Sequence, residues 1–451
     1  MVAIRIKSEY RLRISLVKIG IFFLLLYSFT VPLANYFYPS VIIKYLTLIA
    51  AAGLFCIAML KNLSTLNVRI TPTEIVMFFL GFFVTIGNYE LQIGGYYFVV
   101  SYWVMWVVAV ASKYDGRWLT TVLNLTCIFS MVYALATVIA YLSESIYMTY
   151  MLPLFKGSNQ AQMINFYRDG YMLGLTSHYS TNGMYLAVGV GAFFAKLMEN
   201  LKSKLNWCCL LIMMLALLLT GKRGPLLFAV GAMVVVFYLY KSDKPKGRLL
   251  KIFCLGAAAL VAVLVASIWM PSILNSLNRF ISSSESGDVT AGRGPLFALA
   301  ISLFKQKPLF GWGWGSYQYL YYQYLGKNQY VFQYRHAHNI YLQLLCEVGI
   351  IGFTAFCIFF VWQLYRVLKL YRDYRKGKIL LPSSARSVLP FAVYSQLFFL
   401  MYGMTGNPLY DVIVLFPYLL SCIIVNYYSS AYFSRSRCLM EYFRSLFSKR
   451  K

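Results

Sequence analysis

Long apolar runs recur along this 451-residue chain, and they constrain its fold more than any other feature. A helix needs roughly 20 apolar residues to cross a hydrocarbon core of about 30 Å. Twelve runs come close to or reach that length: 14–33, 41–60, 73–89, 96–112, 119–141, 179–198, 205–220, 225–240, 251–270, 337–364, 387–405 and 411–430. With 60% hydrophobic and 12% charged residues, the composition excludes a soluble globular protein. The sequence predicts an all-α, polytopic membrane protein with about 12 transmembrane helices.

The positions of Lys and Arg predict how these helices are oriented. A formal charge of +27 could suggest nucleic-acid binding, but the basic residues follow the rule that cytoplasmic loops are positively charged. If the N-terminus is cytoplasmic, the basic groups that fall inside are Lys61 and Arg69, Lys113 and Arg117, Lys196, Lys202 and Lys204, and those in 241–251, 366–378 and 435–451. The loops 34–40, 90–95 and 406–410 then lie outside, with no Lys or Arg. We therefore expect both termini to be cytoplasmic and no nucleic-acid partner.

Two of the predicted outward segments, 142–178 and 271–336, are too long to be simple connections. The chain then consists of nine spans with the first outward segment between the fifth and sixth (1–270), the second outward segment (271–336), three spans (337–430) and a basic tail (431–451). The first span is a retained anchor, because no cleavage site follows it. Residues 294–304 suit a short amphipathic helix with Pro295 in its first turn.

Aromatic residues crowd the stretch 310–334 of the second outward loop. Side chains such as Trp312 and Trp314 could stack on sugar rings. The alternative is an aromatic belt at the membrane interface, which is common in membrane proteins. The sequence leaves both interpretations open.

The segment Arg335-His336-Ala337-His338-Asn339 opens the tenth predicted span. Such polar groups are costly at a membrane unless they serve a purpose. A neutral imidazole can accept a proton from an attacking sugar hydroxyl, and His338 is the best placed for this role. A single histidine at a membrane boundary, such as His178, is more often structural.

Glu347 follows about 13 Å deeper in the same predicted helix. It either orients a histidine or arginine or bonds to a neighbouring helix.

Two outward arginines lie in similar short turns. Arg223 lies in Thr220-Gly221-Lys222-Arg223-Gly224-Pro225, and Arg293 lies in Gly292-Arg293-Gly294-Pro295. In each turn an arginine adjoins the free N–H groups of a helix start, an arrangement that suits a phosphate or pyrophosphate. The alternative for each is contact with a lipid headgroup.

No pattern in the sequence predicts a metal ion or other cofactor. There is no paired Asp motif of the kind that holds Mg²⁺, and none of the nine cysteines lies in an outward loop. Nucleotide-binding motifs are also missing from the cytoplasmic loops. The sequence favours metal-independent chemistry on a donor that is already activated and linked to a lipid.

Three motifs between residues 215 and 365 resemble those of the superfamily of O-antigen ligases and Wzy-type polysaccharide polymerases. His338-Asn339, nine residues and then Gly349-Ile-Ile-Gly352 match the spacing of its ligase members. Residues 220–224 are similar to the family's T-G-S-R-G turn, with Lys222 in place of Ser. Arg293 followed by Pro308-Leu-Phe-Gly311-Trp-Gly313 is similar to its R…P-x-x-G-x-G segment. The first 200 residues agree only in hydropathy.

The resemblance implies a GT-C-like glycosyltransferase in a bacterial inner (plasma) membrane. It would transfer a glycan, with inversion and without metal, from undecaprenyl pyrophosphate to an acceptor hydroxyl at the outer face. The expected catalytic residues are His338, Arg293 and Arg223. The expected substrate-binding residues are Lys222, Arg335, His336, Asn339, Glu347, His178, Trp312 and Trp314.

Three functions fit these features. The first is a polymerase that joins lipid-linked repeat units of an O-antigen, capsule or exopolysaccharide. The second is a ligase that passes the glycan to lipid A-core or to a protein. The third is a transporter of lipid-linked oligosaccharide, which we expect least because no internal repeat is evident. The expected partners are an undecaprenyl-pyrophosphate-linked oligosaccharide, membrane lipids, and chain-length regulator and flippase proteins.

Overall fold

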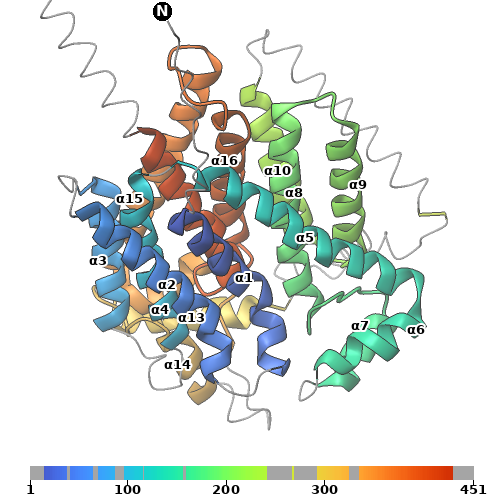
Figure 1. Ribbon diagram of the computed structural model, residues 1–451. Helices are drawn as coiled ribbons and strands as arrows, with labels where there is room; N and C mark the ends of the chain where they lie inside the picture. Colours follow the sequence, from blue (N-terminus) through green and yellow to red (C-terminus); the bar gives the residue numbers. More distant parts are fainter. Residues whose placement is uncertain are drawn as a thin grey trace, which may run out of the picture.

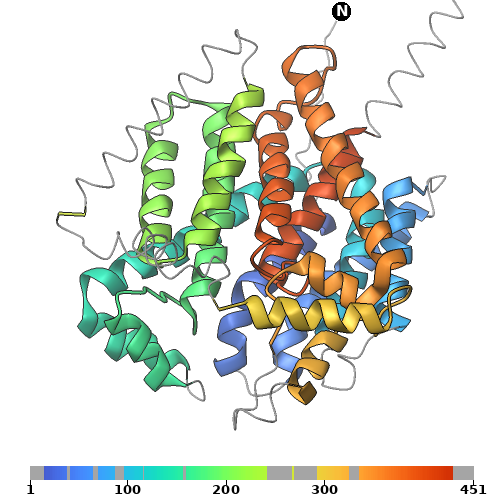
Figure 2. The same ribbon diagram turned by 180° about the vertical axis from the view of Figure 1, so that it is seen from behind.

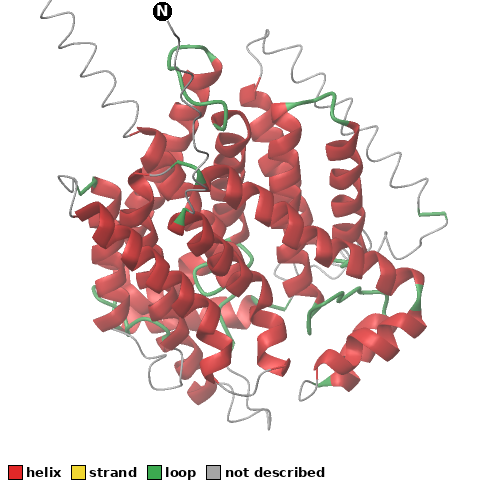
Figure 3. Ribbon diagram, viewed as in Figure 1, coloured by secondary structure: helices red, strands yellow, loops and turns green. Residues whose placement is uncertain are grey.

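The structure is a computed structural model that describes residues 15–37, 41–63, 70–86, 96–114, 116–155, 159–240, 267–268, 292–324 and 335–429. This part of the chain consists of helices and loops, with no β-sheet (Figure 1, Figure 3). The predicted all-α class is therefore confirmed for the described residues.

Eleven of the twelve predicted apolar runs coincide with helices. These are α1 (Leu16–Phe37), α2 (Val41–Leu63), α3 (Pro72–Ile86), α4 (Tyr96–Ala111), α5 (Trp118–Leu142), α8 (Tyr179–Glu199), α9 (Lys204–Leu219), α10 (Arg223–Tyr240), α15 (Ile340–Arg375), α16 (Ala385–Tyr402) and the helix Val412–Ser429. The ninth run, 251–270, lies outside the described residues apart from 267–268. Four helices, α5, α10, α15 and Val412–Ser429, are long and apolar enough to cross a membrane, and several others are shorter and apolar. The chain is a multi-pass membrane protein.

The helices form a single bundle around α8 and α16. Helix α8 packs against α5, α9, α10 and α16, and nearly all of its residues are buried. Figures 1 and 2 show α2–α4 and α15 on one side of the molecule and α8–α10 on the other, with α16 between them. Helix α5 links the two sides, because it contacts both α1 and α9. The apolar surfaces of these helices therefore meet in one continuous core.

Short helices occupy both long segments that were predicted to lie outside. The first segment contains α6 (Glu144–Ile146), η3 (Tyr147–Met151), η4 (Leu152–Phe155) and α7 (Gln160–Arg168). In the second, the amphipathic helix predicted over 294–304 is present as α13 (Gly294–Gln306), with Pro295 in its first turn. A further helix, α14 (Ser316–Tyr324), was not predicted. Figure 2 shows α13 lying crosswise to the long helices, and it packs on α15.

A buried polar cluster joins α3 to the last helices of the chain. Glu74 is fully buried and pairs with Lys113, which follows α4. Its carboxylate also accepts a hydrogen bond from Asn426 at 3.3 Å. Next to it, Arg366 of α15 donates to the Thr73 hydroxyl at 2.6 Å. The charge of Glu74 is therefore compensated within the protein, as a buried carboxylate requires.

Candidate functional site

Helix α15 is broken at Gly349, and this break positions the site. Gly349 has φ 63° and ψ −174°, so the helical hydrogen bonds cannot continue through it. Residues 308–313 lie against the break and replace those bonds. The N–H groups of Trp312 and Gly313 donate to the carbonyls of Cys346 and Glu347, at 3.1 and 2.8 Å. In return, Ile350 N–H donates to the carbonyl of Pro308 at 2.8 Å. The P-x-x-G-x-G segment is therefore the backbone partner of the broken helix.

Glu347, two residues before the break, is buried and accepts hydrogen bonds on both carboxylate oxygens. Oε1 accepts from Gln343 Nε2 at 2.9 Å and from the Tyr317 N–H at 3.3 Å. Oε2 accepts from the Tyr410 hydroxyl. That hydroxyl also accepts from the Gly315 N–H at 3.2 Å. A buried carboxylate with this many partners holds the segments around it in fixed positions.

Gln343 connects Glu347 to the histidine segment. Its Oε1 accepts from the Ala337 N–H at 3.1 Å and from Asn407 Nδ2 at 2.5 Å. Its Nε2 also lies 3.2 Å from Nδ1 of His336. We call Gln318, His336, Gln343, Glu347, Asn407 and Tyr410 the polar network. It joins α14, the segment before α15, α15 itself and the loop 403–411.

His336 belongs to this network rather than to the surface. Its Nε2 lies 3.1 Å from Gln318 Nε2, and its ring lies 4.7 Å from that of Tyr410. Burial, together with the neighbouring His338, lowers the pKa of His336 to about 3. The ring is therefore neutral at pH 7 and can accept the hydrogen bond from Gln343.

His338, two residues on, lies among positive charges. It is exposed and has φ 53°, the only positive φ among the described residues other than glycine. Desolvation by the surrounding protein, followed by the charges of Arg293, Lys222 and Arg335, lowers the pKa of His338 to about 4. The structure thus places Arg293, Lys222 and Arg335, which come from three different segments of the sequence, within electrostatic range of the neutral His338 imidazole.

The turns that contain Arg293 and Arg223 both reach Thr405 in the loop 403–411. Arg293 Nη1 donates to the carbonyl of Thr405 at 2.9 Å. Gly224, which follows Arg223 in the first turn of α10, has its Cα beside the Thr405 hydroxyl. Lys222 lies with its Nζ 4.8 Å from the centre of the Tyr179 ring. The two turns recognised in the sequence therefore both lie against one loop.

Asn339 and His178 have clear structural roles as helix caps. The Asn339 side chain accepts hydrogen bonds from the N–H groups of Tyr341 and Leu342, at 3.0 and 3.1 Å, and so caps α15. The His178 Nδ1 accepts from the Ser180 N–H at 3.1 Å and caps α8. Its ring stacks on Tyr179 with centroids 4.5 Å apart. Their predicted contacts with substrate stay predictions.

Trp312 and Trp314, the two side chains predicted to stack on sugar rings, differ in exposure. Trp312 is partly exposed, its Nε1 donates to the Leu303 carbonyl at 2.9 Å, and Lys307 Nζ lies 4.0 Å from its ring centre. Trp314 is only 2% exposed and stacks between Tyr410 and Phe356. It presents no free face to a sugar in this structure. Its ring belongs to the core beneath the polar network.

Several residues that shape this site could not be selected from the sequence. Gln343, Asn407 and Tyr410 are common residue types in apolar helices and short loops, and only their contacts reveal them. Asp411 follows Tyr410, and burial raises its pKa to about 7. Tyr402 lies within electrostatic range of both Asp411 and Arg293. Asp411 is a lone carboxylate at the start of the last predicted span. It was the one sequence feature that could have directed attention to this loop.

Metal ligands are not grouped in the part of the chain that the structure describes: no three His, Cys, Asp or Glu side chains lie close enough together there to hold an ion.

Comparison with known proteins covers most of the segments that form the site, but not the loop 403–411. Residues 208–357 match the family described as Wzy_C, O-antigen ligase. No match is found among curated proteins. The matched segment includes Lys222, Arg223, Arg293 and His338, and it extends through the break at Gly349. Residues 208–357 of this multi-pass membrane protein therefore form a Wzy_C, or O-antigen ligase, domain.

Proposed function

We propose that this protein is a glycosyltransferase that joins lipid-linked glycan repeat units, and that the reaction takes place beside His338. The observation that carries the proposal is that Arg293, Lys222 and Arg335 lie within electrostatic range of His338 at the start of α15. Such a group of cations suits a diphosphate, and the imidazole suits an attacking hydroxyl. The match to the O-antigen ligase family supports a glycan as the group transferred.

In this proposal the donor is an oligosaccharide linked to undecaprenyl pyrophosphate. An acceptor hydroxyl attacks the anomeric carbon, and the bond from that carbon to the pyrophosphate oxygen breaks. Arg223, Arg293 and Lys222 hold the leaving pyrophosphate and stabilise its charge. His338 takes the hydroxyl proton, and the configuration at the anomeric carbon inverts.

The low pKa of His338 in the empty site fits this role. Cations lower the pKa of an imidazole, and a bound pyrophosphate, which is negatively charged, compensates their effect. The imidazole becomes a stronger base once the donor is in place. His338 therefore activates the acceptor most effectively when the donor is bound, which limits unproductive proton transfer.

We favour a polymerase over a ligase. Aromatic side chains of the second outward segment are exposed, including Phe310 at 68% and Tyr324 at 53%, and such rings suit a long glycan chain. The reaction would take place at the outer face of the bacterial inner (plasma) membrane, with both termini cytoplasmic. A flippase that delivers the donor and a chain-length regulator are the proposed protein partners. Transfer to lipid A-core or to a protein is the alternative.

The test is a transfer reaction with purified protein and undecaprenyl-pyrophosphate-linked repeat units, with the products separated by size. A ladder at multiples of the repeat supports a polymerase. Transfer only after lipid A-core is added supports the ligase instead. No transfer to either acceptor would count against glycosyl transfer with this sugar.

His338→Ala and Arg293→Ala test the assignment of the site. We expect each to lower the rate by about 10² to 10⁴, the range for loss of a general base or of charge stabilisation. Arg386→Ala is the matched control, because Arg386 lies at the N-terminal end of α16, away from the loop 403–411. Full activity in His338→Ala would remove His338 from the mechanism.

A further inference from the structure

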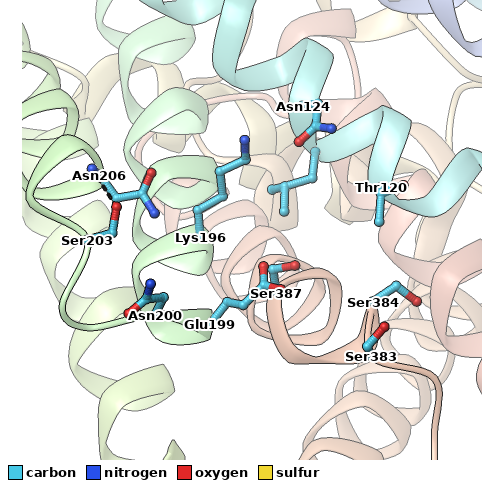
Figure 4. A pocket seen from close by; sticks show the side chains of 11 residues that line it. Thr120, Asn124, Lys196, Glu199, Asn200, Ser203, Asn206, Ser383, Ser384 and Ser387 are labelled. Carbon is cyan, nitrogen blue, oxygen red and sulfur yellow. Dashed lines mark hydrogen bonds between the residues drawn. The ribbon is translucent and has the colours of Figure 1, made fainter.

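A polar cavity of about 410 Å³ lies at the far end of α8 from His178 (Figure 4). Helix α8 has 21 residues, so the two ends are about 30 Å apart. The cavity is lined by Thr120, Leu123, Asn124, Lys196, Glu199, Asn200, Ser203, Asn206, Ser383, Ser384 and Ser387. These residues come from the ends of α5, α8, α9 and α16. The lining therefore lies at one level, at the end of the bundle away from the proposed site.

Several polar groups in this lining have no partner in the described part of the protein. The side chains of Asn124, Lys196, Glu199 and Ser387 make no hydrogen bond or ion pair with any described residue. Ser387 is only 3% exposed, and it faces the cavity. Buried polar groups are normally hydrogen-bonded, so the unpartnered Ser387 hydroxyl indicates a ligand. Asn124 and Glu199 are exposed and Lys196 is partly exposed, so their side chains are accessible to that ligand.

The cavity offers one positive and one negative group, and they are kept apart. Lys196 and Glu199 are three residues apart on α8 but form no ion pair. In Figure 4 the Lys196 side chain extends toward α5 and the Glu199 side chain toward α16. Lys196 also lies within electrostatic range of Cys127 on α5 and Cys209 on α9. Such a pair suits a zwitterion, with a phosphate at Lys196 and an ammonium at Glu199.

An apolar stripe leads away from the cavity along α5. Ile128, Val132, Leu135 and Ile139 are 41 to 58% exposed. Their spacing of four, three and four residues places them on one face of the helix. The stripe begins one turn after Asn124, which lines the cavity. In a membrane protein such a stripe contacts acyl chains, so a ligand with hydrocarbon chains can use both the cavity and the stripe.

We propose that this cavity binds the headgroup of a zwitterionic aminophospholipid whose acyl chains lie along the α5 stripe. Lys196 and the amide of Asn124 bind the phosphate, and Glu199 and the Ser387 hydroxyl bind the ammonium. Glu199 disfavours lipids with net negative charge, because it would repel them. The site is independent of the proposed glycosyl transfer, since it lies at the other end of α8.

Native mass spectrometry of delipidated protein in detergent tests this proposal. The probes are phosphatidylethanolamine, phosphatidylglycerol and glycerophosphoethanolamine, which has the headgroup without the chains. We expect the protein to retain phosphatidylethanolamine in preference to phosphatidylglycerol and to bind the chain-free headgroup at least tenfold more weakly. Preference for phosphatidylglycerol would overturn the zwitterionic headgroup, and equal binding of the chain-free compound would overturn the lipid in favour of a soluble ligand.

Three variants locate the site. Lys196→Gln is expected to reduce retention of phosphatidylethanolamine at least tenfold. Lys202→Gln is the control, because Lys202 is exposed in the next turn and does not line the cavity. Glu199→Gln replaces an exposed side chain, which favours normal folding, and should remove the preference against phosphatidylglycerol. Unchanged lipid selectivity in both Lys196→Gln and Glu199→Gln would overturn the proposal.

Discussion

Gly311 and Gly349 lie backbone to backbone, and neither has room for a side chain. A Cβ added to Gly349 would lie 2.3 Å from the carbonyl oxygen of Leu309. A Cβ added to Gly311 would lie 2.4 Å from the carbonyl carbon of Glu347. Both distances are too short for carbon atoms, and the neighbours are backbone atoms that cannot rotate away. Gly311 and Gly349 must therefore both be glycine, because the backbone around each leaves no space for a Cβ atom on the other.

Gly349→Ala should separate residues 308–313 from α15 and abolish transfer. Gly377→Ala is a matched control, since Gly377 also has a positive φ, 70°, but nothing lies within 4 Å of an added Cβ. That control should cost only about 1 kcal/mol, the price of a left-handed residue with a side chain. Thermal unfolding and transfer activity of the two variants would be compared. Equal effects would mean that backbone strain, and not the contact, explains the loss.

Gln343→Leu should disconnect the polar network. Glu347, Ala337 and Asn407 would each lose a buried hydrogen bond, at about 1–3 kcal/mol for each group left unpaired. Gln363→Leu is the control on the same helix: Gln363 is equally buried, but it makes one long bond of 3.4 Å and its Oε1 has no partner. We expect unfolding and loss of transfer in Gln343→Leu and little change in Gln363→Leu. If Gln343→Leu has normal activity, the network does not position His338.

Lys222→Met should raise the pKa of His338, because it removes one of the positive charges that lower it to about 4. The chain has three histidines, so each ring can be followed by nuclear magnetic resonance after selective labelling. The His338 signal of the free protein should titrate at higher pH in the variant than in the unsubstituted protein. Lys305→Met, on the exposed side of α13, should leave it unchanged. An unchanged titration in Lys222→Met would place Lys222 away from His338.

The stability that His336 contributes should depend on pH. Its pKa is about 3 in the folded protein and about 6.5 when unfolded, so the unfolded chain takes up a proton first. This contribution is complete above pH 6.5 and is lost as the pH falls toward 3, by about 1 kcal/mol per pH unit. The raised pKa of Asp411 changes the stability with pH in the opposite direction. The unfolding temperatures of the unsubstituted protein and His336→Gln are therefore compared, because Asp411 contributes equally to both. That difference in unfolding temperature should shrink between pH 7 and pH 4; a constant difference would contradict the burial of His336.

His178→Asn should retain full activity, because asparagine also caps helices well. His178→Ala should lower the stability of the protein by about 0.5–2 kcal/mol through loss of the cap on α8. Thermal unfolding and transfer activity would be measured for both variants. Loss of activity in a stable His178→Asn protein would show that the imidazole contacts the substrate as well as the helix.

The sequence predicted the helices and part of the site, for physical reasons. Apolar runs must be buried or in lipid, so eleven of them reappear as helices. His338, Arg293 and Lys222 were selected because charged groups are costly at a membrane, and the structure brings them together. The contacts of Gln343 with Asn407 and of Glu347 with Tyr410 bridge 64 and 63 residues of chain, and no local pattern encodes them. The capping roles of Asn339 and His178 depend on side-chain directions, which the sequence alone does not fix.

The polar cluster around Glu74 has a consequence for biosynthesis. Thr73 and Arg366 are separated by 293 residues, and Glu74 and Asn426 by 352. A ribosome that adds residues in order produces α3 long before its partners exist. Until α15 and the helix Val412–Ser429 have entered the membrane, Glu74 depends on Lys113 alone among these partners. Helix α3 therefore reaches its final arrangement only after α15 and the helix Val412–Ser429 have been made. Although it is synthesised early, its folding is completed together with that of the last helices.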